Sequence, residues 1–297
     1  MSLKSEYAVK LPSGEIVSII IGNDGSVSNS GWPVNASSNE PLGRLIFLSY
    51  IAFRSGDKIP RSGAGLCGVF PYNPNSPFLA RPIETDTIHA ASSITLATRF
   101  FQAYPDYFTL EQKLRIINVL TIHDLGETTD IPDDGSKDKE EKFECELTEI
   151  CKKFQHLSPK ERDELLLDYI IFAHADDPIW PEEDRRVMQF AKLCDKADAI
   201  LSAFCYELDC RGGSLLTKEN MYGGLTEQDK FYIDETGSFR PGDVFTAHFI
   251  DNYNSFYYFK EMFDVILAAC FYVRQSNFPW LEKFLKKRKL ICNVAVN

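Results

Sequence analysis

Two histidines and two aspartates offer the ligand types of a divalent metal site. His123 and Asp124 are adjacent, His89 precedes them, and Asp195 follows. Two neutral imidazoles and two carboxylates make a set of two nitrogen and two oxygen ligands. Such a set suits Mn²⁺, Co²⁺, Fe²⁺ or Zn²⁺ and leaves coordination positions for water and substrate. We therefore expect these four residues to hold one divalent metal ion.

The segment that carries His123 and Asp124 also carries a third polar side chain, Glu127. A helix is predicted to begin at Thr109, where Gln112 completes a capping box, and to end near Glu127. On such a helix, His123 and Glu127 are four residues apart and share the inward apolar face, where an uncompensated charge is costly. A metal ion would neutralise the carboxylates and accept a lone pair from the imidazole.

The other two metal ligands are expected on separate helices. His89 lies on the apolar face of a predicted helix over residues 85–103, and Asp195 on that of a helix over residues 181–206. Taken singly, each has an ordinary interpretation, because a lone histidine is often a hydrogen-bonded core residue and Asp195 could pair with Lys192. The coincidence of four such residues favours the metal site.

Helical patterns dominate the chain after a short β-rich start. A long loop is predicted over residues 63–82, which are rich in Gly, Pro and Asn, and Ser158-Pro159 marks the predicted start of a later helix. Residues 7–11 and 15–21 alternate around a Pro-Ser-Gly turn and predict a hairpin. We expect an all-α helical bundle with a small N-terminal β-hairpin appendage. Its regions would be a β and loop appendage over residues 1–40, the metal-binding core over residues 41–210, and a C-terminal helical extension over residues 211–297 that packs on the core.

Composition narrows the class of partner and the compartment. The formal net charge of −11 disfavours a nucleic acid polymer or an anionic membrane as a partner, because both select basic surfaces. No apolar run approaches the roughly 18 residues of a membrane span. The eight cysteines form no CxxC pair, and Cys151, Cys194 and Cys270 fall on apolar helix faces. Reduced, buried thiols and a cytoplasmic location are therefore expected.

The order of the four ligands, with a histidine, then His-Asp, then an aspartate on successive helices, resembles the signature of the HD-domain phosphohydrolase superfamily. The His-Asp-x-x-Glu extension that ends at Glu127 looks most like its 5′-deoxynucleotidase-like branch. The resemblance covers about residues 46–203. It implies an HD-domain bundle and a phosphoric monoester hydrolase that removes the 5′-phosphate from (deoxy)nucleoside monophosphates, so that the partner is a small phosphorylated molecule.

The resemblance also implies roles for four further residues. Glu127 would orient or deprotonate the attacking water, and Asp130 would protonate the leaving 5′-oxygen. Arg61 lies in a Pro-Arg segment, and Lys192 lies in a Lys-x-x-Asp segment that ends at Asp195. Both cations would contact the phosphate. The ordinary alternatives are surface cations for Arg61 and Lys192 and a solvated turn carboxylate for Asp130.

Three other functions stay open at this stage. Another HD hydrolase reaction would act on a cyclic nucleotide, a nucleoside triphosphate or an alarmone. A dinuclear-iron HD oxygenase would need two more histidines, for which His174 and His156 are the candidates. A domain that only binds a nucleotide would signal through a partner. The aromatic run over residues 253–259 suits either a core or a homodimer contact.

Overall fold

The chain begins with an antiparallel sheet and continues as helices. The computed structural model describes residues 3–33, 85–127, 139–208, 216–217, 238–239, 256–264, 266 and 286. The chain divides into two compact units. One contains residues 1–62 and 84–195, and the other contains residues 63–83 and 196–297. The predominance of helix expected from the sequence is confirmed for the described residues.

Three short strands form the N-terminal sheet. They are β1 (Glu6–Lys10), β2 (Ile16–Ile21) and β3 (Val27–Ser30), in the order β1-β2-β3 with both pairs antiparallel. The predicted hairpin is therefore present as β1 and β2. The sequence interpretation did not include β3, whose four residues, Val-Ser-Asn-Ser, are mostly polar and lack the apolar alternation of a half-buried strand.

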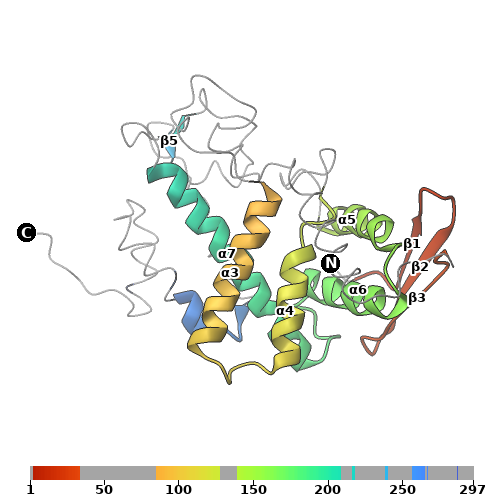
Figure 1. Cartoon of the computed structure of the whole chain (residues 1–297), viewed down its shortest axis with the longest axis horizontal. Coiled ribbons are helices and arrows are strands. Elements are labelled where there is room, and N and C mark those ends of the chain that lie inside the picture. The colour runs from red at the N-terminus through yellow and green to blue at the C-terminus, as the bar shows by residue number, and fades with distance from the viewer. Residues whose placement is uncertain are drawn as a thin grey trace, which may run out of the picture. The chain divides into compact units, whose positions relative to one another are not determined.

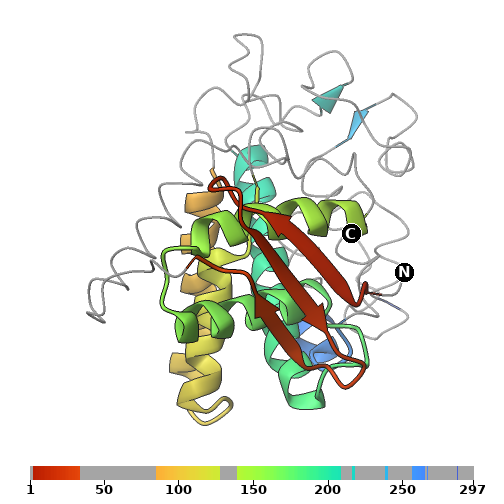
Figure 2. The ribbon, with the colours of Figure 1, turned by 90° about the vertical axis from the view of Figure 1, so that its right-hand side faces the viewer.

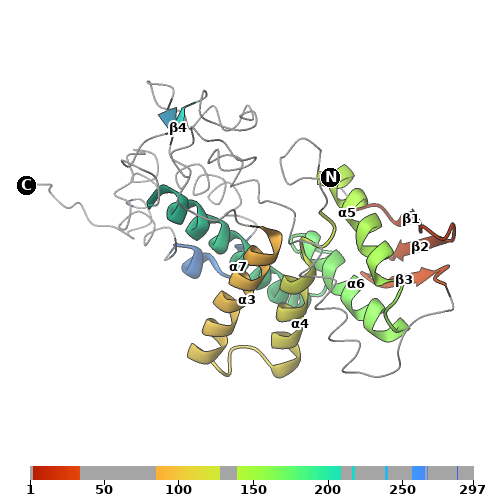
Figure 3. The same cartoon turned by 45° about the horizontal axis from the view of Figure 1, so that its top comes forward.

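The helices labelled in Figure 1 follow: α3 (Asp86–Ala103), α4 (Leu110–Ile122), α5 (Lys139–Phe154), α6 (Pro159–Ala173) and α7 (Glu182–Leu208). A further helical segment is described at residues 260–264. Helix α7 continues from the first unit into the second. Within the first unit, Figure 3 shows α5 and α6 between the sheet and α4, with α3 beside α4.

Local capping signals explain where α4 and α6 begin. The Thr109 hydroxyl accepts the N–H of Gln112, and the Gln112 side chain accepts the N–H of Thr109, which confirms the predicted capping box. At α6, the Ser158 hydroxyl accepts the N–H of Glu161, and Pro159 occupies the first helical position. Both helices therefore begin within a residue of the positions that the sequence predicts.

The end of α4 differs from the prediction. The helix stops at Ile122, and residues 123–126 form a turn. The N–H groups of Leu125 and Glu127 donate to carbonyls three residues earlier, over 2.9 and 3.0 Å. Such bonds wind the backbone more tightly than an α-helix does, so His123 and Glu127 do not share a helical face. The expected helix to residue 127 is wrong in its last turn.

One face of the sheet packs on α5 and α6, as Figure 2 shows. The Tyr7 ring meets the Phe143 ring edge-on at 5.3 Å, and the Tyr7 hydroxyl donates to Glu140 over 2.8 Å. At the other end of the sheet, the Arg162 guanidinium lies 4.2 Å from the centre of the Trp32 ring. The sheet therefore belongs to the same compact unit as the helices.

Aromatic and charged contacts join the helices of the first unit. The Phe190 ring of α7 lies 4.7 Å from the Phe100 ring of α3 and 4.9 Å from that of Phe108, centre to centre. Arg115 of α4 donates to Asp168 of α6 over 2.8 Å and to Asp184 of α7. The two carboxylates offset the cost of taking the guanidinium out of water. The relative positions of α3, α4, α6 and α7 are thus fixed from several directions.

The second unit is described in part. Strand β4 (Leu216–Thr217) pairs antiparallel with β5 (Ser238–Phe239), and the buried rings of Phe256 and Phe263 lie 5.3 Å apart. Most of the predicted C-terminal extension, the predicted loop over residues 63–82 and Cys270 lie outside the described residues. Cys151 and Cys194 are buried, as expected. Among the described helices, none combines the length and apolar character that crossing a membrane requires.

The close packing of the sheet on the rest of the unit predicts that a side chain at Gly25 lowers the stability of the protein strongly. This residue has φ +79°, and a Cβ there would lie 2.7 Å from the Ile179 carbonyl oxygen. Gly14 has φ +99° but open space around it. We expect Gly14→Ala to cost about 1 kcal/mol of unfolding free energy for the positive φ alone. Gly25→Ala should cost roughly 1–3 kcal/mol more, because the turn must move away from the Ile179 carbonyl in the segment between α6 and α7. Urea denaturation measures both; equal losses would contradict the close packing.

Candidate metal centre

The four expected ligands come from three helices and the turn that follows one of them. His89 lies near the start of α3, His123 is the C-terminal cap of α4, Asp124 begins the turn, and Asp195 lies on α7. His89, His123 and Asp195 are at most 5% exposed, whereas the Asp124 side chain is 14% exposed. Asp124 is therefore the most solvent-exposed of the four expected ligands.

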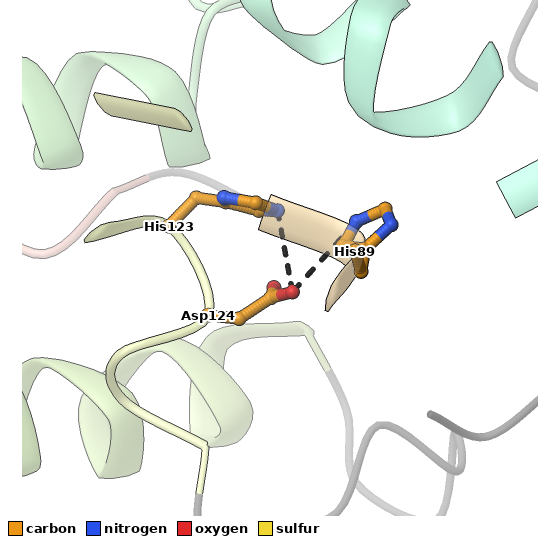
Figure 4. A group of neighbouring side chains, drawn as sticks. All are labelled: His89, His123 and Asp124. Carbon is orange, nitrogen blue, oxygen red and sulfur yellow. Dashed lines mark ion pairs between the residues drawn. The ribbon is translucent and has the colours of Figure 1, made fainter. Parts of the chain in front are cut away.

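The Nε2 atoms of both imidazoles face the same two carboxylate oxygens. His89 Nε2 lies 2.9 Å from Asp195 Oδ1 and 3.8 Å from Asp124 Oδ2. His123 Nε2 lies 3.2 Å from Asp124 Oδ2 and 3.8 Å from Asp195 Oδ1. Figure 4 shows the two rings turned toward Asp124 from different sides. The ligand atoms of His89, His123 and Asp124 all lie within 4.8 Å of one another, and Asp195 adjoins this group through both imidazoles.

A hydrogen bond on the far side of the His123 ring sets its orientation. Nδ1 lies 2.9 Å from the Leu120 carbonyl oxygen. A carbonyl oxygen only accepts, so Nδ1 carries the proton in this bond and a neutral ring presents the Nε2 lone pair to the carboxylates. A backbone carbonyl behind a histidine is the usual support of a metal-binding imidazole.

The residues present fit a divalent ion. A lone pair of His123 Nε2 that faces carboxylate oxygens is unfavourable unless a proton or a metal ion lies between them. Ligand bonds of about 2.1 Å place neighbouring ligand atoms about 3.0 Å apart in an octahedron and about 3.4 Å apart in a tetrahedron. The four nitrogen–oxygen distances, 2.9 to 3.8 Å, span these values. This cluster could hold a metal ion.

A second group of carboxylates adjoins the first. Asp86, Asp124 and Glu127 have oxygen atoms within 4.8 Å of one another, so Asp124 belongs to both groups. Asp86 and Glu127 are each 3% exposed. The sequence interpretation placed Glu127 here but missed Asp86, although its position three residues before His89 on one helix was a usable signal.

Glu127 owes its position to the close approach of the turn to α5. A Cβ on Gly126 would lie 2.5 Å from the Glu146 Cβ and 2.7 Å from its Cα, so only glycine fits at this distance. Lys153 of α5 also donates to the Leu125 carbonyl. Beside them, the Lys142 ammonium lies 3.6 Å from Glu127 Oε1. Packing on α5, and not helical periodicity, brings Glu127 to the cluster.

Of the cations expected to contact phosphate, the structure describes Lys192. Its ammonium donates to the Ala173 carbonyl over 2.9 Å and lies 5.5 Å from the centre of the Phe172 ring, which in turn packs 5.7 Å from the His123 ring. Lys192 is thus separated from His123 by one aromatic ring. Arg61 and Asp130 lie outside the described residues.

The two histidines considered for a dinuclear oxygenase are located elsewhere in the first unit. His156 is exposed in the turn after α5. His174 lines a cavity of about 300 Å³ with Lys139, Glu140 and Asp176, and its Nε2 is 4.0 Å from Glu140 Oε2. Within the described ranges, the groups of residues that could hold a metal ion include neither histidine.

No family model, curated protein or solved structure matches this chain. The chemistry of the site therefore has to be argued from its own residues.

The geometry predicts that each expected ligand contributes to metal binding. Metal-stripped protein should bind one divalent ion per chain. The variants His89→Gln and Asp195→Asn should each weaken metal binding by at least about 10–100-fold, because loss of a group that only supports a ligand already weakens binding by that much. Competition with a chelator, combined with elemental analysis, measures this affinity. His156→Gln, on an exposed histidine, should leave it unchanged. Unaltered affinity in the His89 or Asp195 variant would exclude that residue as a ligand.

The environment of His174 predicts an acid-sensitive stability. Burial, followed by the charges of Lys139 and Lys192, lowers the pKa of His174 from 6.5 to about 4. The unfolded chain then takes up this proton before the folded chain does, so stability falls as pH falls from about 6.5 to about 4, by about 3 kcal/mol. Burial also raises the pKa of Asp168 to about 6, which opposes this loss, so urea denaturation should show the His174 contribution as the difference in pH dependence between the wild type and the His174→Gln variant. His174→Gln should remove it, whereas His156→Gln should not.

Proposed function

We propose that this chain is a metal-dependent phosphohydrolase of the HD-domain type, which removes the 5′-phosphate from (deoxy)nucleoside monophosphates. One observation carries the proposal: the Nε2 atoms of His89 and His123 converge on Asp124 Oδ2 and Asp195 Oδ1 within 2.9 to 3.8 Å. This convergence supports the proposal, because His89, His123 and Asp124 form a group that could hold a metal ion and Asp195 adjoins both imidazoles.

The donor set indicates the class of metal. Two imidazole nitrogens and two carboxylate oxygens suit Mn²⁺, Co²⁺, Fe²⁺ or Zn²⁺ better than Ca²⁺ or Mg²⁺, which favour oxygen ligands alone. A divalent ion supplies a Lewis acid and a water ligand of lowered pKa when it is bound at such a site. His123 is held for this role by the bond from its Nδ1 to the Leu120 carbonyl.

Glu127 is the residue placed to handle a proton. Its carboxylate belongs to the group with Asp86 and Asp124, which adjoins the group of His89, His123 and Asp124. A carboxylate one ligand away from the ion can accept a proton from an attacking water at Oε1 or Oε2. We assign this role to Glu127, and keep Asp130 as the group that would protonate the leaving 5′-oxygen.

The negative charge of a phosphate substrate has to be neutralised by cationic side chains at the site itself, because the chain as a whole carries a net charge of −11. Lys192 lies on the same helix as Asp195, three residues before it, with its ammonium near the Phe172 ring that packs on His123. Lys192 and Arg61 are the residues that we expect to neutralise the phosphoryl oxygens. The substrate is a small phosphorylated molecule, and its base is a matter for experiment.

The alternative is a different hydrolytic reaction on the same metal centre, with a cyclic nucleotide, a nucleoside triphosphate or an alarmone as substrate. Each of these would release a different product. The dinuclear oxygenase is less favoured, because His156 is exposed and His174 faces Glu140 instead of the metal ligands.

The proposal predicts metal-dependent phosphate release. Metal-stripped protein supplied with Mn²⁺, Co²⁺, Fe²⁺ or Zn²⁺ should release phosphate from deoxyribonucleoside monophosphates in a panel that includes ribonucleotides, cyclic nucleotides and triphosphates. Glu127→Gln should lower kcat by about 10²–10⁴-fold, because it removes the proton acceptor, and should leave the metal content unchanged. Glu164→Gln, on an exposed glutamate of α6, is the matched control.

Two results would contradict these assignments separately. Full activity of the Glu127→Gln variant would remove Glu127 from the mechanism. A wild-type protein that binds an ion but releases phosphate from no monophosphate would exclude the nucleotidase function, and the other products of the panel would then decide between the remaining hydrolytic reactions.

A further inference from the structure

Glu127 is a buried carboxylate in an acidic neighbourhood. It is 3% exposed and shares its cluster with Asp86 and Asp124. Carboxylates so close together repel one another, and the repulsion is weakly screened in a buried site. A carboxylate that has to accept a proton in a defined direction therefore needs a fixed partner that opposes this repulsion.

Lys142 of α5 provides such a partner. Its ammonium lies 3.6 Å from Glu127 Oε1 and 3.3 Å from Glu146 Oε1. Glu146 is four residues further along α5, so one helical face presents both the cation and a carboxylate that holds it. The Lys142 side chain is 26% exposed, so most of its surface is packed against neighbouring groups.

Tyr169 of α6 anchors this arrangement from the other side. Its hydroxyl donates to Glu146 Oε2 over 2.8 Å, while Glu146 Oε1 faces Lys142. Tyr169 is 1% exposed, and burial, followed by the nearby charge of Glu146, raises its pKa well above the usual value. It therefore stays a neutral donor at any physiological pH. The chain of contacts runs from Tyr169 through Glu146 and Lys142 to Glu127.

The backbone beside Glu127 also packs against α5. Gly126 lies against the backbone of Glu146, and Lys153 donates to the Leu125 carbonyl. Helix α5 thus fixes both the turn and the carboxylate at its end. The sequence pattern of the metal ligands does not indicate these contacts. Helix α5 supplies no ligand to the group of His89, His123 and Asp124.

We propose that Lys142 is a positioning residue for Glu127: held by Glu146 and Tyr169, it fixes the direction of the carboxylate that accepts the proton. This role rests on the proposed function of Glu127. It adds a residue that the sequence interpretation did not select.

The test is a double-mutant cycle on kcat and KM. Lys142→Met keeps the stem and removes the charge. It should lower kcat by about 10–100-fold and change KM by less than about 3-fold, because it acts through another residue and not on substrate. Lys142→Arg should recover most of the loss. Lys152→Met, on an α5 lysine paired with Glu149, is the matched control and should retain wild-type kcat.

The decisive variant is the combination of Lys142→Met with Glu127→Gln. If Lys142 acts through Glu127, Lys142→Met should cause no further loss of kcat in the Glu127→Gln background, since coupled residues are not additive. The same cycle on the urea midpoint of metal-free protein provides a second measurement that does not depend on activity. There, too, the two substitutions should be non-additive.

The outcomes separate this inference from the function on which it rests. Phosphate release by the wild type together with additive losses in both cycles, or wild-type kcat in Lys142→Met, would overturn the role of Lys142 and leave the hydrolase standing. Absence of phosphate release by the wild type on the whole panel would overturn the proposed function and the role of Lys142 with it. Non-additivity in both cycles supports the inference.

Discussion

Much of the first unit depends on one constraint, which is that two imidazoles and two carboxylates share a buried position. Each Nε2 atom lies 2.9 to 3.8 Å from the two carboxylate oxygens, so ring nitrogens and carboxylates are crowded together away from water. Such a group is tolerable when a cation neutralises it and when the helices that carry it are firmly placed. The packing of Phe190 against α3 and the bonds of Arg115 to α6 and α7 supply that placement.

The sheet and α5 form the support on the other side. Tyr7 donates to Glu140 and packs on Phe143, and two turns of α5 that begin there carry Lys142 and Glu146. The sheet is therefore more than an appendage. It packs on α5, and α5 in turn contacts the turn that contains His123 and Asp124. This connection links a β-structure without an obvious chemical role to the carboxylate that we assign to proton transfer.

Prediction from the sequence succeeded where a local signal is strong. The capping box at Thr109 and Gln112 and the Ser158-Pro159 start of α6 depend on neighbouring residues alone, so the sequence pattern is sufficient. It failed at the end of α4, where contacts of Gly126 with α5 override the helical period, and at β3, whose polar residues carry no strand pattern. Sequence reasoning also missed Lys142, because its partner is distant in the chain.

The sequence by itself determined which residues have the ligand chemistry for a metal ion and that His89 and Asp195 lie on separate helices, because ligand chemistry and helical periodicity are local properties. Only the tertiary structure decided that His89, His123, Asp124 and Asp195 meet, since their distances depend on how three helices pack. It also decided that Glu127 reaches the cluster through a turn packed on α5. Contacts between distant segments are set by the summed packing of many side chains, and no short stretch of sequence encodes that sum.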